Sequence, residues 1–135
     1  MKKGKEVESK NNNVVDIKER VKSFEDALTV TGRPAMPDFS SVPVDLKDYF
    51  EAQYKVVVIA EALNEGWVPN WNDHDQEKCF PWFRVSSSGF VYCDTLCSYS
   101  GAYAGCSSRL CCKNSELATY FGEQFIDIWN KILLK

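Results

Sequence analysis

The chain is organised around residues 62–113, whose sequence is ALNEGWVPNWNDHDQEKCFPWFRVSSSGFVYCDTLCSYSGAYAGCSSRLCCK. This stretch contains three of the four tryptophans, all six cysteines and the only histidine of the protein. Long helical patterns precede and follow it. We therefore expect any chemistry of the chain to lie in this stretch, and the rest of the chain to support it.

The middle of the stretch has the alternation of a β-hairpin. Residues 79–85 and 90–97 predict two strands, and residues 86–89 predict the turn between them. Pro81 assigns the first strand to a sheet edge, because proline donates no hydrogen bond to the ladder. After a loop rich in serine, tyrosine and glycine, residues 107–113 predict a third short strand.

Two helices are predicted next to this stretch. Residues 45–65 form the first, with Asp45 as the N-cap and Gly66 as the stop, and their apolar run at 56–60 indicates a buried central helix. Residues 115–134 form the second, capped by Ser115, with an apolar stripe that belongs to the core.

The N-terminal part predicts an arm and one more short helix. Residues 1–13 are polar and rich in lysine and asparagine, which is typical of a flexible arm. Asp16 and Glu19 have capping-box spacing, and apolar residues follow at helical intervals as far as Gly32. Three prolines make residues 33–44 a connector. Residues 14–135 are thus predicted to form a single α+β domain, with a small three-stranded antiparallel sheet packed against two to three helices.

Length, charge and hydropathy limit the classes of function. A chain of 135 residues is long enough for one core, and its net charge of -3 gives no reason to expect duplex nucleic acid as a partner. The basic N-terminus lacks the apolar segment of a secretory signal, and the apolar run at 56–60 is too short to cross a membrane. We therefore predict a cytoplasmic protein whose six cysteines are thiols.

The aromatic, amide and basic residues of the stretch suit a nucleotide-like anionic ligand. Tryptophan faces stack on bases, and asparagine and glutamine carry the paired donor and acceptor that read a base edge. The turn that ends at Arg109 offers amides, hydroxyls and a guanidinium, which suit a phosphate. The residues predicted to bind ligand are Trp67, Asn70, Trp71, Asn72, Gln76, Lys78, Trp82, Ser107, Ser108, Arg109 and Lys113.

Other interpretations of these residues remain open. Either Trp82 or its neighbour Phe83 must face the core, and Arg109 could serve only to pair with Glu61 or Glu65. Zinc binding would use Cys93, Cys97, Cys106 and one of Cys111 and Cys112, but the spacings are irregular. A hydrolase would use a cysteine with His74 as base, or the carboxylates Asp73, Asp75 and Glu77. We predict no catalytic residue, metal or cofactor.

Several segments also resemble a known family. Residues 61–72, Gln76, Lys78, 81–83, 108–113, 115–118 and 122–125 are similar to a family of small proteins of unassigned role from phages and mobile elements of gut Bacteroidetes. The resemblance covers residues 24–134 and transfers no catalytic or binding residue.

A phage setting would place the protein in the cytoplasm of the host cell. It suggests a non-enzymatic sponge that sequesters an immune second messenger. The alternative is a protein–protein interaction module, such as a virion component or an inhibitor of a host protein. A homo-oligomer is predicted as well.

Overall fold

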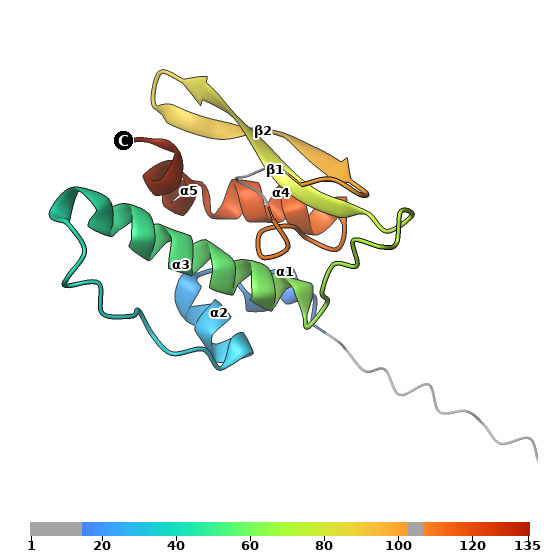
Figure 1. Ribbon diagram of the computed structural model, residues 1–135, viewed down its shortest axis with the longest axis horizontal. Helices are drawn as coiled ribbons and strands as arrows, with labels where there is room; N and C mark the ends of the chain where they lie inside the picture. The colour runs from blue at the N-terminus through green and yellow to red at the C-terminus, as the bar shows by residue number, and fades with distance from the viewer. Residues whose placement is uncertain (1–14, 103–106) are drawn as a thin grey trace, which may run out of the picture.

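The computed structural model describes residues 15–102 and 107–135. Its elements are α1 (Ile17–Arg20), α2 (Phe24–Thr31), α3 (Val44–Asn64), β1 (Lys78–Ser86), β2 (Gly89–Ser98), α4 (Ser115–Gln124) and α5 (Ile126–Leu133). Figure 1 shows the hairpin on one side of α4 and α5, and the long helix α3 on the other. Helices α1 and α2 pack against α3. The fold is therefore α+β, as predicted, and the predicted arm at 1–13 lies outside the described residues.

Helix α3 is the central helix that the sequence predicts. Its bounds lie one residue from the predicted ones, and its second half is buried, including Ile59 and Leu63. The predicted cap was wrong: Pro43 occupies the N-cap without a side-chain hydrogen bond, and Asp45 lies in the first turn. Neither α3 nor any other described helix is both long enough and apolar enough to cross a membrane.

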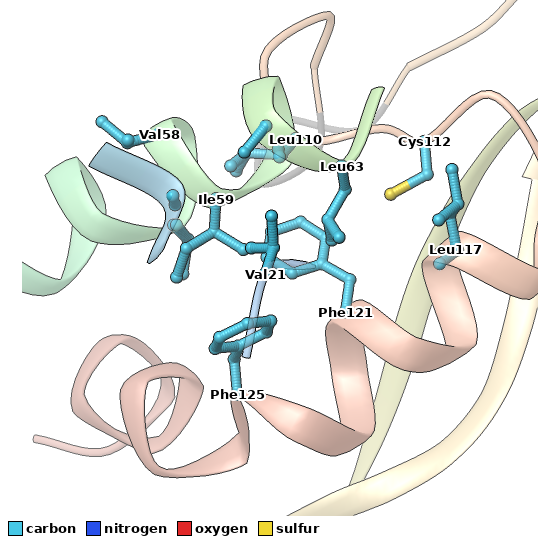
Figure 2. Close-up of a cluster of buried hydrophobic side chains, with 14 of the residues drawn as sticks. Val21, Val58, Ile59, Leu63, Leu110, Cys112, Leu117, Phe121 and Phe125 are labelled. Atoms are coloured by element: carbon cyan, nitrogen blue, oxygen red, sulfur yellow. The ribbon is translucent and has the colours of Figure 1, made fainter. Parts of the chain in front are cut away.

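The core lies between α3 and the C-terminal helices. Figure 2 shows Ile59 and Leu63 of α3 beside Phe121 and Phe125, with Val21 completing the cluster from the segment between α1 and α2. The indole N–H of Trp129 donates to the Phe121 carbonyl over 3.1 Å, so this buried polar group is satisfied. Apolar burial of α3 and α4 against each other thus holds the helical layer together.

Two predicted helices are each divided in the structure. The first ends after Arg20, and a second begins after Ser23, whose hydroxyl accepts from the Asp26 amide at 3.1 Å. The last breaks at Phe125, which turns α5 so that the Phe125 and Trp129 rings both contact Phe121. The predicted Ser115 cap was wrong by one residue, because Asn114 accepts the hydrogen bond at the start of α4.

The predicted hairpin is confirmed and the predicted third strand is wrong. Strands β1 and β2 pair antiparallel from Lys78 opposite Ser98 to Ser86 opposite Gly89, and a φ of 115° at Gly89 explains why glycine ends the turn. Residues 107–110 form a turn, because the amides of Leu110 and Cys111 both donate to the Ser107 carbonyl. In this segment only Cys112 pairs with β1, opposite Cys79. The described residues therefore form a two-stranded sheet.

Candidate functional site

A pocket of about 320 Å³ lies where the end of α3 meets the turn at residues 107–110. It combines apolar side chains with an indole, a hydroxyl and two opposite charges. Its lining residues are Val57, Glu61, Asn64, Trp67, Val68, Pro69, Ser108 and Arg109. The structure thus brings together three of the predicted ligand residues, Trp67, Ser108 and Arg109.

The end of α3 brings Trp67 back over the helix. Glu65 and Gly66 both have positive φ angles, 50° and 85°, and these two left-handed residues reverse the chain. The Trp67 amide then donates to the Asn64 carbonyl at 2.9 Å. Trp67 and the two residues after it therefore line the pocket beside the helix that precedes them.

The side chain of Asn64 holds the other wall of the pocket. Its amide N–H donates to the Cys111 carbonyl at 2.9 Å, and its oxygen accepts from the Lys113 amide at 3.0 Å. Asn64 is buried, so these bonds satisfy polar atoms that would otherwise lack partners. They fasten residues 111–113, and with them the turn that carries Ser108 and Arg109, to α3.

The charges around the pocket leave Arg109 available for a ligand. Glu61 is held by Arg33, whose Nε and Nη2 donate to the two carboxylate oxygens at 2.8 and 3.0 Å. The guanidinium of Arg33, with a smaller contribution from Arg109, keeps the pKa of Glu61 below its usual value. Glu61 is thus ionised at neutral pH and already neutralised. No carboxylate within the described ranges forms an ion pair with Arg109.

Trp71 lies next to the pocket and is attached to its rim. Its indole N–H donates to the Ser108 hydroxyl oxygen at 2.6 Å, and the Lys78 ammonium lies 5.3 Å from the centroid of its ring. Because Ser108 accepts this bond, its own O–H remains a donor. The loop at 66–77 and the turn at 107–110 are therefore connected directly at the edge of the pocket.

Two of the predicted amide residues stabilise the loop itself. The Gln76 side-chain oxygen accepts from the Asn70 amide at 2.6 Å, and the Asn70 side-chain oxygen accepts from the Asn72 amide at 3.0 Å. The third, Asn72, is exposed. None of the three lines the pocket. Their predicted role in reading a base edge is therefore not supported by their position.

Lys78 is used inside the protein. Its side chain is completely buried, and its ammonium donates to the carbonyl oxygens of Asp73, Gln76 and Tyr99 at 2.9, 3.0 and 2.7 Å. An ammonium has three donors, so all of them are occupied. The sequence marked Lys78 as a ligand residue, but its contacts are those of a residue that holds the loop to the hairpin.

The remaining predicted residues lie outside the pocket. Trp82 is half exposed on β1, and its neighbour Phe83 packs against Trp129, which settles which of the two faces the core. Ser107 uses its carbonyl to form the turn, and Lys113 uses its amide to bond Asn64. Gly105 and Cys106, the first two residues of the predicted phosphate-binding turn, lie outside the described residues.

Sequence reasoning missed the helical wall of the pocket. Val57, Glu61 and Asn64 recur at intervals of four and three residues and so share one face of α3. That spacing was visible in the sequence, but the apolar run around it predicts only a buried helix. The sequence offered Glu61 only as an alternative ion-pair partner of Arg109, and the position of residues 67–69 and 108–109 against this face followed from the tertiary fold.

The predicted thiol state is wrong for two cysteines. Cys79 and Cys97 lie opposite each other on β1 and β2 and form a disulfide with a Cα–Cα distance of 4.1 Å. Directly opposed residues bring their Cβ atoms close enough to be bridged, although 18 residues separate these two along the chain. The sequence spacing alone gave no reason to pair them.

The residues predicted for a hydrolase site and for a zinc site lie in different surroundings. His74 Nδ1 lies 2.9 Å from the Ser100 hydroxyl, and Asp73 accepts from the Asp75 amide. Cys93 is exposed, whereas Cys111 is buried, and burial raises the pKa of its thiol. In the described part of the chain, the group of donors close enough to share a metal is Glu77, Cys79 and Cys97, which differs from the predicted zinc set.

Searches of protein-family models, curated proteins and solved structures find no match to this chain.

Proposed function

We propose that this protein binds and sequesters a nucleotide-like anionic small molecule in the pocket between α3 and the turn at residues 107–110. The observation that carries the proposal is that Trp67 and Arg109 line one concave pocket. An indole beside Val57, Val68 and Pro69 suits the flat, weakly polar face of a base. Arg109, whose charge is not used in an ion pair with any described residue, suits a phosphate.

The dimensions and polarity of the pocket favour a small ligand. A volume of about 320 Å³ is near the lower end of the range for small-molecule sites, roughly 300–1,000 Å³. Glu61 would repel an anion if it were alone, but Arg33 neutralises it. The pocket therefore suits one planar group with one anionic group, the size of a mononucleotide.

Sequestration without conversion is the mode of action that we propose. Two groups that line the pocket could act as base or nucleophile, but Arg33 is bonded to the Glu61 carboxylate and the Ser108 oxygen accepts from Trp71. A binder that only holds its ligand has the properties of the second-messenger sponge suggested by the phage-family resemblance. Such a protein would act in the cytoplasm of the host cell.

The test is calorimetric titration with nucleoside 5′-monophosphates and cyclic mononucleotides, with the matching nucleosides titrated in parallel. Arg109→Ala is expected to weaken nucleotide binding about ten-fold, because one charge-assisted hydrogen bond to phosphate is lost. The affinity for the uncharged nucleosides is expected to stay the same. The bound nucleotide, released by denaturation, is expected to have an unchanged mass.

Two further variants complete the test: one should leave nucleotide affinity unchanged, and the other should increase it. Arg84→Ala removes an exposed arginine on β1, away from the pocket, and is expected to leave the affinity unchanged. Glu61→Gln removes the negative charge from the wall and is expected to tighten nucleotide binding roughly two- to three-fold, the scale of a partly exposed charge pair. The proposal fails if no nucleotide binds, or if Arg109→Ala weakens nucleosides equally. A released product of altered mass would instead indicate an enzyme.

A second candidate function, self-association, is supported by an exposed apolar surface at the start of α3. Val44, Leu46, Tyr49 and Phe50 are exposed by 91, 43, 40 and 41 %. Leu46 and Tyr49 line a groove of about 910 Å³ between α3 and the end of α5, and Val44 and Phe50 lie close to them in the sequence. Acidic side chains line the α3 side of this groove at Asp45 and Asp48, and the α5 side carries the basic Lys131 and Lys135 together with the acidic Asp127.

This distribution suits a second copy of the chain as the occupant. A two-fold axis would place the acidic α3 side of each groove against Lys131 and Lys135 of the other, and would cover the apolar residues between them. We therefore propose that the protein forms a homodimer through this surface.

Sedimentation velocity at increasing concentration tests the dimer. The wild type is expected to show a monomer–dimer equilibrium, and Leu46→Ser combined with Phe50→Ser is expected to weaken the dimer at least about ten-fold by removing two buried apolar contacts. Val85→Ser changes a residue that is 70 % exposed on the hairpin and is expected to have no effect. A wild-type chain that is monomeric throughout the concentration range would refute this interface.

A further inference from the structure

The hairpin carries a cluster of metal-ligand atoms distinct from the proposed ligand pocket. One oxygen of Glu77 and the two sulfurs of Cys79 and Cys97 all lie within 4.8 Å of one another. In the structure the two sulfurs form a disulfide, which cannot ligate a metal as thiolates do. The chemistry of the cluster therefore depends on its oxidation state.

Strand pairing places the two sulfurs on one face, and the residue just before β1 adds the carboxylate. Cys79 and Cys97 are direct cross-strand partners, so their side chains point the same way whether or not the disulfide is present. Glu77 immediately precedes β1, and one of its carboxylate oxygens lies within 4.8 Å of both sulfurs. The Glu77 carboxylate lies 4.0 Å from the Cys79 sulfur. Reduction thus leaves two thiols and a carboxylate already together.

The surroundings of the cluster suit a bound ion with one open position. Cys79 is buried, whereas Cys97 and Glu77 are exposed, so an ion could enter from the solvent side and keep a water ligand there. The Tyr99 hydroxyl donates to the second Glu77 oxygen at 3.4 Å. Such a bond from outside the ligand set orients a carboxylate ligand.

We propose that the reduced form of the hairpin binds a borderline-soft divalent cation of the zinc class through Glu77, Cys79 and Cys97. Thiolates favour zinc-like ions over magnesium or calcium, and three protein ligands plus water satisfy tetrahedral geometry. Formation of the disulfide closes the site. The site is therefore available in a reducing environment, such as the cytosol, and absent in an oxidising one.

Opening the site takes two steps: a two-electron reduction of the disulfide, and then replacement of the two thiol protons by the metal ion. A dithiol reductant transfers two electrons and two protons to the disulfide, the S–S bond breaks, and the reductant itself becomes a disulfide. Each protein thiol then gives up its proton as the metal binds. Air or a disulfide oxidant reverses the process and releases the ion.

The test is native mass spectrometry and cadmium absorption on the full chain, before and after treatment with a phosphine reductant. The reduced wild type is expected to bind one Zn²⁺ or Cd²⁺ per chain at this site, with the ultraviolet charge-transfer band of cadmium–thiolate bonds, and the oxidised chain none. Excess Mg²⁺ is expected not to compete. The phosphine supplies the electrons and becomes its oxide, with water as the oxygen source.

Two variants at exposed positions test the ligands without removing the buried Cys79. Cys97→Ser is expected to lower the charge-transfer band of this site by at least half, because only one thiolate remains there to bond cadmium. Glu77→Gln is expected to weaken the affinity by at least the roughly 10–100-fold that loss of an outer partner costs. Cys93→Ser removes the exposed thiol of β2 outside the cluster and is expected to bind normally.

The proposal is overturned if the reduced wild type binds neither ion. It is also overturned if Cys97→Ser and Glu77→Gln bind as tightly as the wild type, because the ligands would then lie among the other cysteines. Equal binding by the oxidised and reduced chains would exclude the redox dependence. None of these outcomes bears on nucleotide binding, because the cluster and the pocket share no residue.

Discussion

Replacing Lys78 with methionine is expected to lower the free energy of unfolding by about 2–4 kcal/mol, the largest effect that we predict for a single substitution. The ammonium of Lys78 bonds three carbonyl oxygens, from Asp73, Gln76 and Tyr99, in a fully buried position. Methionine keeps much of the chain length but donates to none of them. Burying the lysine charge costs free energy, and methionine avoids that cost. The expected loss of stability is therefore smaller than the sum of the three hydrogen bonds from the ammonium.

Chemical denaturation measures this difference, and limited proteolysis locates it. The loop at 66–77 is expected to become the first site of cleavage. The Lys78 ammonium holds the end of this loop, at Asp73, to Tyr99 just after β2, and methionine cannot make these bonds. Lys22→Met, at an exposed position, serves as the control and is expected to change stability by no more than about 0.5 kcal/mol. If Lys78→Met unfolds like the wild type, the ammonium contributes little and Lys78 becomes a candidate ligand residue again.

The second large effect is expected at Gly122, where α4 packs on the hairpin. A Cβ atom at this position would lie 2.6 Å from Pro81 Cβ and 2.8 Å from Tyr92 Cδ2. Pro81 cannot rotate away, and the Tyr92 hydroxyl is held by hydrogen bonds with Thr95 and Thr119. Gly122→Ala is therefore expected to destabilise the protein by about 1–3 kcal/mol through overpacking, although alanine is the better helix former.

Thermal and denaturant unfolding test this prediction with a matched substitution. Gly101→Ala adds the same methyl group at a position where the nearest atom is Ser98 Oγ at 3.9 Å. That variant is expected to stay within about 0.5 kcal/mol of the wild type. A neutral or stabilising Gly122→Ala would mean that α4 and the hairpin can separate without cost. The close contact of Gly122 with Pro81 and Tyr92 would then not limit the packing of α4 on the hairpin.

Local sequence signals predicted the elements well where the signal was periodic. Alternation with the turn at 86–89 identified the hairpin, and the long pattern at 45–65 identified α3 within one residue of its ends. The signals failed at residues 107–113, where small and apolar residues suggested a strand. There the Ser107 carbonyl accepts two amides and forms a turn instead. A short segment without a clear period carries too little local preference to decide between these conformations.

The candidate site was predictable only in part. Trp67, Ser108 and Arg109 were identified from residue type and do meet in one pocket. Lys78 was assigned to the ligand on the same basis, and its burial could not be inferred from its charge, because lysine is rarely buried without partners. Nothing in the local sequence marks Arg33, which neutralises Glu61 from 28 residues away in the chain.

For this protein, the order of residues along the chain was sufficient for the α+β class, the hairpin and the buried central helix, because these follow from hydrophobic period and turn chemistry between neighbours. The partners of individual polar groups followed only from the tertiary structure. The Lys78–Tyr99 contact, the Arg33–Glu61 pair and the Cys79–Cys97 disulfide all join residues that strand register and helix packing bring together. A charged or reactive side chain acquires its role from what surrounds it, and distant segments supply those surroundings here.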